Sequence, residues 1–383
     1  ATIAFGVAAI GEGPPARAVQ ALLSSSRERI VMVAAPFTPS AAAARTKSAW
    51  VPRVWLRQGS DGDATLGVDV VDGDVGAATQ LLDVAFQPAP PTPLPPRGRG
   101  AQKLPFARTD LPDRAGHAAA VDDVLATIAR GEASKIVLAR RTRLEVAVRG
   151  DAVDDVLAGL LARESRGTAY LFVDGSDAFF GCSPERLCVR RGRTLEVDAL
   201  AGTAPRGTTA ADDDVLARRL LEDGKERREH AAVVEAITAV LAPLSAQLDV
   251  PSTPRLVRLG RVQHLHTPIT ATLVDDAPVF AALHPTPAIA GTPRDVAVAA
   301  IARLEPFPRG RYAGYVGVAD VDGETLTVAL RCAHAHDEVT GGVVDVFAGS
   351  GLVDGAVAER EWLELERKAS LMLDVIADVV GDP

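Results

Sequence analysis

The spacing of apolar positions predicts a long helix near the C-terminal end of the chain, from about Ala356 to Val380. Its apolar side chains recur at helical intervals and suit packing against a core: Trp362, Leu365, Leu373 and Val375. Beside them runs a polar face on which Glu361, Glu364 and Lys368 follow one another at i, i+3 and i+7. The helix therefore combines a buried side with a face that carries two carboxylates and an ammonium group.

A second pair of glutamates with the same spacing, Glu226 and Glu229, falls on another predicted helix, 225–241. Isolated pairs of this kind are most often solvated helix faces that form intrahelical ion pairs. Two such faces that converge would instead suit a hard cation such as Mg²⁺, because carboxylate oxygens are its preferred ligands. The spacing alone leaves both interpretations open.

Elsewhere the hydrophobic pattern predicts strands and helices that alternate irregularly. The predicted helices are 75–84, 118–130, 153–162, 211–222, 225–241 and 293–304. The predicted strands are 30–35, 48–51, 135–140, 170–173, 179–187 (two strands and a turn), 195–200, 256–265, 312–319, 326–333 and 343–348. Because the regular spacing of βαβ units is missing, the pattern favours an α+β fold with mixed sheets.

Prolines crowd the stretch 87–100, which can therefore hold neither a sheet ladder nor a helix. We expect this stretch to be a loop that ends an N-terminal part, residues 1–110. The motifs discussed below fall in the remainder, residues 115–383.

Composition narrows the class of protein. Of the 383 residues 47% are hydrophobic and 24% are charged, as in ordinary globular proteins. A net charge of -9 without a basic block argues against a nucleic-acid partner. Three cysteines without a C-x-x-C pair indicate reduced thiols and a cytoplasmic protein. No apolar run is long enough to predict a membrane span.

Lys135 and Glu185 are candidates for acid–base chemistry. Lys135 opens an apolar strand, where it either reaches out to solvent or is a partly buried amine with a lowered pKa. Glu185 follows Ser183-Pro184, which is typical of the first turn of a helix. The strand-like residues directly after it argue against that helix and leave a functional role open.

Three further features have competing interpretations. His264 and His266 alternate on one face of a strand, as zinc ligands can, but strand histidines more often form structural hydrogen bonds. The glycines of Gly349-Ser350-Gly351 either expose backbone N–H groups to an anion or end a strand. Arg331 interrupts an apolar run, and an unpaired guanidinium there would be costly, so an anionic partner is indicated.

Taken together, several short motifs resemble the chorismate-utilising enzymes, the family of isochorismate, salicylate, anthranilate and aminodeoxychorismate synthases. They cover roughly residues 115 to 383 in the family's order: 135–140 (KIVLAR), 181–186 (GCSPER), 200–207, 225–230, 262–265 (VQHL), 284–288 (HPTPA), 311–314 (RYAG), 330–331, 348–351 (AGSG) and 361–368. Each motif is weak alone, and their number and order carry the resemblance. It implies two stacked, mostly antiparallel sheets flanked by helices, with the active site in the cleft between them. Residues 1–110 would then be the variable part of the same fold.

The resemblance also implies a magnesium ion. Glu229 and Glu364 match the positions of direct metal ligands, and Glu226 and Glu361 match outer carboxylates that reach the metal through water. Four carboxylates in one cleft would repel one another without a dication, which agrees with this assignment. Bound Mg²⁺ would hold the ring carboxylate of chorismate as a Lewis acid.

Other positions match the family's contacts to the substrate, a dianion. On the side of the enolpyruvyl carboxylate they are Arg331, Tyr312 and the backbone of Gly349. On the side of the ring carboxylate and the metal they are Lys368, Gly202 and Thr203, and His264 matches a histidine near the ring.

The resemblance favours the isochorismate branch, which adds water at C2 and expels the C4 hydroxyl. Lys135 matches the base of this reaction and Glu185 the acid, with the amine neutral and the carboxyl protonated. Amination is disfavoured because that branch usually carries glutamine at the position of Lys135. Ala201, which precedes Gly202, excludes the nucleophilic lysine of the aminodeoxychorismate branch.

Salicylate synthases share the acid and the base, but typically carry threonine where this chain has Ala288. Tyr312 stands where some isochorismate synthases have phenylalanine, and Cys182 where alanine is frequent. Ala288 followed by Ile289 fits the isomerase, so the favoured activity is chorismate isomerisation for menaquinone or siderophore biosynthesis, by a cytoplasmic monomer. The alternatives are a lyase that forms salicylate and a non-catalytic chorismate-binding protein.

Overall fold

The computed structural model describes residues 106–380, apart from short gaps at 165–166, 175, 259–261, 276–278, 321 and 339–340, together with Phe37 and the backbone of six strands nearer the N-terminus. The predicted helix 75–84 and the Pro-rich stretch 87–100 lie outside the described residues.

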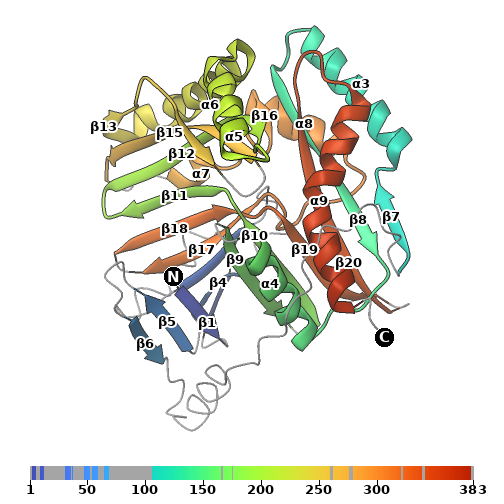
Figure 1. Ribbon diagram of the computed structural model, residues 1–383. Coiled ribbons are helices and arrows are strands. Elements are labelled where there is room, and N and C mark those ends of the chain that lie inside the picture. The colour runs from blue at the N-terminus through green and yellow to red at the C-terminus, as the bar shows by residue number, and fades with distance from the viewer. Residues whose placement is uncertain are drawn as a thin grey trace.

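Two large antiparallel sheets form the body of the protein (Figure 1). The first has seven strands, in the order β16 (Gly291–Thr292), β8 (Lys135–Leu144), β20 (Gly341–Leu352), β19 (Cys332–Glu338), β10 (Asp177–Ser183) and β9 (Thr168–Asp174), with β7 (Arg108–Leu111) also paired to β8. The second has ten strands, in the order β13 (Ser245–Asp249), β15 (Val262–Leu273), β12 (Thr194–Pro205), β11 (Arg186–Arg191), β18 (Gly323–Val328), β17 (Tyr315–Asp320), β3 (Val31–Ala35), β4 (Lys47–Val51) and β2 (Ala9–Glu12), with β14 (Arg255–Arg258) paired to β15. A separate three-stranded sheet consists of β1 (Thr2–Phe5), β5 (Val54–Gln58) and β6 (Ala64–Val68).

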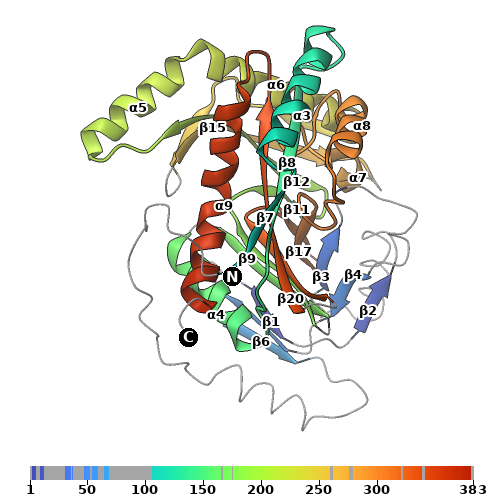
Figure 2. The same cartoon turned by 90° about the vertical axis from the view of Figure 1, so that its right-hand side faces the viewer.

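Helices flank both sheets, which confirms the predicted α+β class and its two antiparallel layers. They are α3 (Arg114–Ala129), α4 (Asp151–Arg163), α5 (Ala210–Glu222), α6 (Gly224–Leu241), α7 (Val279–Leu283), α8 (Arg294–Leu304) and α9 (Ala358–Val380), with a short 3₁₀ turn at Ala242–Leu244. Figure 1 shows α5 and α6 beside β12 and β15, whereas α9 and α3 stand beside the other sheet. In Figure 2, α9 runs along the sheet with α4 against its C-terminal part.

Two apolar cores hold these layers together. One lies between the seven-stranded sheet and the helices α4 and α9, and it includes Phe180, Val346, Leu365 and Ile376. The other core joins the two sheets with α3, α6 and α8. All four apolar positions predicted for the C-terminal helix are buried, so the helical spacing identified its core side correctly. Among the described residues, none of the helices is both long and apolar enough to cross a membrane.

Three predicted strands were wrong in extent. The run 256–265 is two strands, β14 and β15, that pair antiparallel with each other. The run 312–319 becomes a strand only at Tyr315, because Tyr312 and Ala313 form a turn in which Ala313 has φ 56°. The run 326–333 is not one strand, because the chain leaves the ten-stranded sheet after Val328 and enters the seven-stranded sheet at Cys332.

The chain passes between the two sheets at two neighbouring places. It leaves β10 at Ser183 and enters β11 at Arg186, and it returns from β18 to β19 across 329–331. The two crossings are hydrogen-bonded to each other: the N–H of Val328 donates to the carbonyl of Glu185 (2.9 Å), and the N–H of Cys182 donates to the carbonyl of Arg331 (3.2 Å). Glu185 and Arg331 thus lie side by side where both sheets meet.

Three of the N-terminal strands, β2, β3 and β4, belong to the second sheet, since β3 pairs with β17 from Ala35 opposite Tyr315 to Val31 opposite Ala319. On this pairing we propose that residues 1–110 are part of the same fold as residues 115–383.

Candidate active site

Arg331 occupies a strained turn at the second crossing. Its backbone has φ 50°, in the left-handed region that costs a non-glycine residue energy. Within the described residues no hydrogen bond or ion pair holds its guanidinium, which is half-buried. Burial lowers the pKa of Arg331, while Tyr312, Glu185, Glu164 and Glu364 act to raise it. A cation held this way needs an anion from outside the protein, as the sequence suggested, although Arg331 lies between two strands and not within one.

Glu185 lies in the turn of the first crossing, not in a helix. The Ser183 hydroxyl accepts a hydrogen bond from the N–H of Glu185 (3.2 Å), so the Ser-Pro-Glu sequence forms a local turn between strands. Burial raises the pKa of the Glu185 carboxyl, although Lys135, Arg331 and Lys368 lower it. Within the described residues its side chain makes no hydrogen bond, so a carboxyl that holds its proton more firmly than an ordinary glutamate is left available to a ligand.

Lys135 opens β8, and its side chain extends over β20. Its Nζ lies 3.6 Å from Oε1 of Glu229, and its side chain is 15% exposed. A Cβ added to Gly351 would come within 2.8 Å of Cε of Lys135, and one added to Gly349 within 2.6 Å of the Tyr312 hydroxyl. These glycines lie among the last residues of β20, which ends at Leu352, so they stand close to a strand end. Contact of their backbone with an anion stays a prediction. A larger residue would not fit at position 349 or 351, because the side chains of Tyr312 and Lys135 lie across these glycines.

A β-bulge in β12 arranges Gly202 and Thr203. Pairing with β15 slips between Ala201 and Thr203, and Gly202 has φ 72°. As a result the N–H of Thr203 donates to Oε2 of Glu226 (2.8 Å). The Thr203 hydroxyl lies 3.0 Å from Nδ1 of His264, and burial lowers the pKa of that histidine to about 4. His264 is therefore neutral at pH 7.

His266 has a separate, structural role. Its Nε2 lies 2.7 Å from Oδ1 of Asp198, which also accepts a hydrogen bond from Arg186. His264 and His266 thus lie within hydrogen-bonding distance of different partners. For both residues the interpretation as a hydrogen-bonding strand histidine applies.

The two predicted Glu-x-x-Glu pairs lie on α6 and α9, each with one glutamate held by the sheet. Glu226 accepts the Thr203 N–H, and Glu361 accepts a hydrogen bond from the Ser350 hydroxyl (2.6 Å). The other member of each pair faces a lysine: Glu229 faces Lys135, and Glu364 lies 2.6 Å from Nζ of Lys368. Lys368 also donates to the carbonyl of Gly349 (2.8 Å).

The donor set has the chemistry that Mg²⁺ prefers, since all four candidates are carboxylates and two are fixed by hydrogen bonds. In the described part of the chain, however, no three His, Cys, Asp or Glu side chains come close enough together to form a metal site. Glu229 and Glu364 are each paired with a lysine. The magnesium site stays a prediction.

The predicted site residues nevertheless act on one another electrostatically. Lys135, Arg331 and Lys368 all act on Glu185. Arg331, Lys368 and Glu229 all act on His264. Residues from both crossings, from β8 and β15, and from α6 and α9 therefore lie close enough together to influence one another's protonation.

Ala288 lies in the segment between α7 and β16, which borders β8. The N–H of Val137 donates to the carbonyl of Ala290 (2.8 Å), which ties this segment to the strand that begins at Lys135. Ala288 is half-buried, and the next residue, Ile289, is buried.

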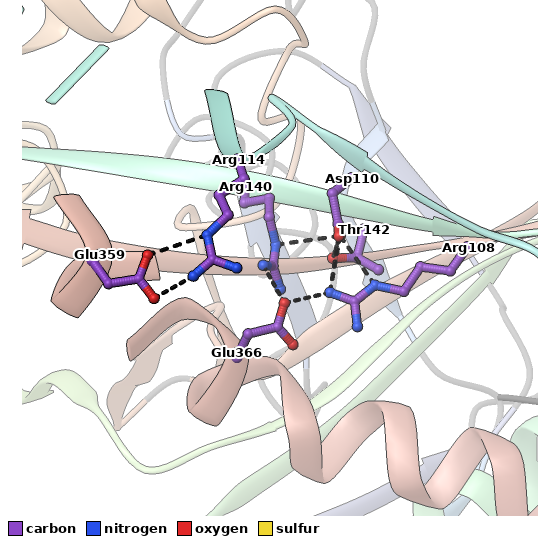
Figure 3. A network of polar contacts seen from close by, with 7 residues as sticks. All are labelled: Arg108, Asp110, Arg114, Arg140, Thr142, Glu359 and Glu366. Carbon is purple, nitrogen blue, oxygen red and sulfur yellow. Dashed lines mark hydrogen bonds and ion pairs between the residues drawn. The ribbon is translucent and has the colours of Figure 1, made fainter. Parts of the chain in front are cut away.

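A network of charges fixes α9 against β7 and β8 (Figure 3). Arg140 is fully buried; its Nη1 lies 2.6 Å from Oε1 of Glu366, and its guanidinium lies over the Trp362 ring at 4.6 Å. Asp110 accepts hydrogen bonds from Arg108 (3.1 Å) and Thr142 (2.6 Å) and lies 3.4 Å from Arg140. The network sets the position of the helix that carries Glu361, Glu364 and Lys368.

Sequence reasoning missed several residues that support the site. Ser350 was included only as part of a glycine motif, and Glu366 lies off the polar face considered for the C-terminal helix. Glu305 and Arg309 were also missed, although an acid and a base four residues apart in a Pro- and Gly-rich segment are a usable signal.

Comparison with known proteins agrees with this geometry. Residues 39–377 match the family of chorismate binding enzymes. The chain belongs to this family. It is 39% identical to isochorismate synthase MenF of Escherichia coli (strain K12) over 261 residues, which cover 68% of this chain and 59% of the relative. It is also 39% identical to the salicylate biosynthesis isochorismate synthase of Pseudomonas aeruginosa (strain PAO1) over 269 residues, which cover 69% of this chain and 55% of that protein.

A solved structure supports the relationship over most of the fold. The menaquinone-specific isochorismate synthase MenF from Escherichia coli superimposes with a TM-score of 0.83 at 29% identity, covering 98% of this chain and 85% of that one. The sequence matches span between half and two thirds of the length of the two curated relatives.

Proposed function

We propose that this chorismate binding enzyme is an isochorismate synthase, an isomerase that converts chorismate to isochorismate. The observation that carries the proposal is the shared site of Glu185, Lys135 and Arg331. Burial raises the pKa of the Glu185 carboxyl, the Lys135 amine acts on it electrostatically, and Arg331 beside it is left for an anion. The names of the two relatives support the same activity.

In the proposed reaction, Lys135 accepts a proton from a water molecule whose oxygen bonds to ring carbon C2. The ring double bonds shift, the bond between C4 and its hydroxyl oxygen breaks, and Glu185 supplies the proton with which that oxygen leaves as water. One water enters and one leaves, so the product is an isomer of the substrate. The reaction needs a neutral amine and a protonated carboxyl before turnover.

The substrate carries two carboxylates, and the proposed contacts assign one to each side of the site. Arg331, with the Tyr312 hydroxyl and the backbone of Gly349 next to it, would bind the enolpyruvyl carboxylate. Lys368, Gly202 and Thr203 would line the side of the ring carboxylate. His264 would contact the ring as a neutral imidazole, which agrees with its lowered pKa.

Magnesium is part of the proposal. Glu229 and Glu364 would bind the ion directly, and Glu226 and Glu361, held by Thr203 and Ser350, would orient its water shell. When bound, the ion would neutralise the ring carboxylate and withdraw electron density from the diene. The pairing of the inner glutamates with Lys135 and Lys368 predicts that added Mg²⁺ competes with these two ammonium groups.

The deciding experiment is incubation of the purified protein with chorismate and Mg²⁺, with separation of the products. Isochorismate without pyruvate supports the proposal. Pyruvate equal to the chorismate consumed would identify a salicylate-forming lyase, and an absence of turnover would favour a binding protein. Omitting Mg²⁺, and titrating it with Glu364→Gln, tests the metal: an unchanged titration would contradict ligation by Glu364.

Ala288 is the proposed control point between isomerase and lyase. We expect Ala288→Thr to raise the share of pyruvate, because the side chain would add a hydroxyl beside the ring. A product ratio equal to that of the unmodified protein would show that the branch is decided elsewhere.

The wider role follows from the proposed product. Isochorismate would feed menaquinone or siderophore biosynthesis, the protein would act in the cytoplasm on a small-molecule substrate, and it would function as a monomer. Light scattering of the purified protein checks the last point and should give the mass of one chain.

A further inference from the structure

The outer edge of β8 has a gap in its ladder between Ile136 and Arg141. β16 pairs with Lys135 and Ile136, and β7 pairs with the strand only from Arg141 onward. Between them, the carbonyl of Val137 accepts a hydrogen bond from Nη2 of Arg309 (2.8 Å), and the N–H of Ala139 donates to Oε1 of Glu305 (2.8 Å). A side-chain ion pair therefore replaces the missing strand neighbour.

This ion pair is almost completely buried and all of its contacts are made inside the protein. The Glu305 and Arg309 side chains are each 3% exposed and lie 2.6 Å apart at Oε1 and Nη2. Nε of Arg309 donates to the second oxygen of Glu305 (2.8 Å), and Nη1 donates to the carbonyl of Ile289 (2.8 Å). The guanidinium also lies over the Phe37 ring at 4.2 Å. Burial opposes the charge, but Glu305 more than offsets it, so the pKa of Arg309 lies above its ordinary value.

The two carbonyl groups that accept hydrogen bonds from Arg309 belong to residues close in sequence to the proposed site. Val137 is two positions after Lys135, and Ile289 directly follows Ala288. The N–H of Tyr312 donates to the carbonyl of Arg309 (3.0 Å), and the Arg309 guanidinium lies 5.7 Å from the centre of the Tyr312 ring. Arg309 thus contacts the segments that contain Lys135, Ala288 and Tyr312.

We propose that Arg309, held by Glu305, is a positioning residue that fixes Lys135, Ala288 and Tyr312 relative to one another and thereby sets the rate and product of the reaction. The proposal rests on the function proposed above. Arg309 acts through the carbonyls of Val137 and Ile289, and nothing in the contacts requires it to touch the substrate.

Arginine suits this position because its planar group carries five N–H donors that point to several acceptors at once. Lysine would keep the charge beside Glu305, but its single nitrogen cannot span Val137 and Ile289 together. Arg309→Lys should therefore retain the ion pair and release the Ala288 segment.

The test uses the double substitution Glu305→Met with Arg309→Met, beside Arg309→Lys. Exchanging a buried ion pair for apolar side chains of similar size is often neutral or stabilising, so the double variant is expected to fold. We expect its kcat for isochorismate formation to fall by about tenfold or more while KM changes less, because misplaced reacting groups slow chemistry more than binding. The share of pyruvate and the pH profile should also shift, and amide exchange in the peptides 134–140 and 286–292 should become faster.

Arg303→Met is the matched control. Arg303, on α8, also pairs with an acid, Asp123 of α3, but these side chains are 55% and 40% exposed. Its kcat, product ratio and exchange should equal those of the unmodified protein.

The results separate the two proposals. A folded double variant with unchanged kcat, product ratio and exchange would overturn the positioning role. If the unmodified protein forms no isochorismate, the proposed function fails, and exchange in the two peptides then decides the positioning role by itself. If the double variant does not fold, Arg309→Lys decides in its place: unchanged turnover and exchange would overturn the inference.

Discussion

Arg309 and Arg331 both act on Tyr312, yet the protein treats their charges in opposite ways. Arg309 is buried, paired with Glu305 and bonded to two carbonyls. Arg331 lies in a strained turn, and no hydrogen bond or ion pair engages its guanidinium within the described residues. Accordingly, the pKa of Arg309 is raised and that of Arg331 is lowered. The difference distinguishes two kinds of charged residue: framework charges, which are paired inside the protein and stabilise the fold, and ligand-directed charges, which lie in the proposed site and are proposed to contact the substrate or its metal ion.

The same contrast occurs on one helix. Glu366 of α9 is committed to Arg108 and Arg140, which fix the helix against the sheet (Figure 3). Two residues earlier, Glu364 faces Lys368 in the proposed site. Substitutions of framework charges should therefore reduce stability, whereas substitutions of ligand-directed charges should reduce activity and leave stability nearly unchanged.

The largest effect is expected at a ligand-directed group. Glu185→Gln removes the proposed acid but keeps the size of the side chain, so kcat should fall by roughly 10² to 10⁴-fold while the free energy of unfolding stays the same. Glu196→Gln, an exposed glutamate of β12, is the control. Steady-state kinetics with chorismate gives the answer, and a kcat within tenfold of normal would remove Glu185 from the acid role.

A framework charge should give the opposite outcome. Glu366→Gln leaves the buried Arg140 without its nearest carboxylate, and breaking a buried pair costs about 3–5 kcal/mol of unfolding free energy. Glu359→Gln breaks the exposed pair with Arg114 on the same helix, whose side chains are 55% and 60% exposed, and should cost at most about 1 kcal/mol. Urea denaturation measures both, and equal losses would contradict the distinction between the two pairs.

The stability of the fold should also depend on pH through His117, whose ring packs edge-on against the Trp362 ring. Burial, with a smaller effect of Arg140, lowers the pKa of His117 to about 4 from 6.5. A lowered pKa means that the folded state binds the proton less well, so stability is full above pH 6.5 and falls as the pH drops toward 4. The loss at pH 4.5 should be about 2–3 kcal/mol.

His117→Phe tests this cause, since it removes the titrating group and keeps an aromatic ring. Denaturation at pH 7 and pH 4.5 should show a smaller loss in the variant than in the unmodified protein. Identical losses in both proteins would assign the acid sensitivity to other groups, such as Glu366 and Asp345, whose pKa values are lowered as well.

The smallest effect is expected where charge is kept but geometry is lost. Arg331→Lys preserves a cation for the enolpyruvyl carboxylate and removes the paired N–H donors, so KM for chorismate should rise by about tenfold. Arg191→Lys, on the exposed end of β11, should leave KM unchanged. A normal KM in Arg331→Lys would mean that Arg331 does not bind the carboxylate through two donors.

Local patterns predicted most of the longer helices in the described residues well, although α7 was missed and α3 begins four residues before its predicted start. Helices α5 and α6 begin within one residue of the predicted starts and end where they were expected to end. Their ends are encoded nearby: Thr209 accepts a hydrogen bond from the N–H of Asp212, and Asp223 accepts one from the N–H of Glu226. Such caps depend on neighbours in the sequence, which a single chain reveals.

The sheet crossings could not be predicted in the same way. The apolar run around Val328 and Ala333 looks continuous, but it changes from one sheet to the other at Arg331, and periodicity within a short run says nothing about which sheet receives it. The spacing of Glu305 and Arg309 could have indicated an ion pair, but its role at the edge of β8 appears only when the gap in that ladder is known. The family resemblance supplied the site residues that patterning could not.

The paired crossings also determine how the protein can be divided. Each large sheet takes strands from both halves of the sequence: β10 pairs with β19 in one and β11 with β18 in the other. Neither half could therefore complete a sheet by itself, and truncation in the middle would leave unpaired edges on both pieces. Fragments of this enzyme should regain structure only when combined.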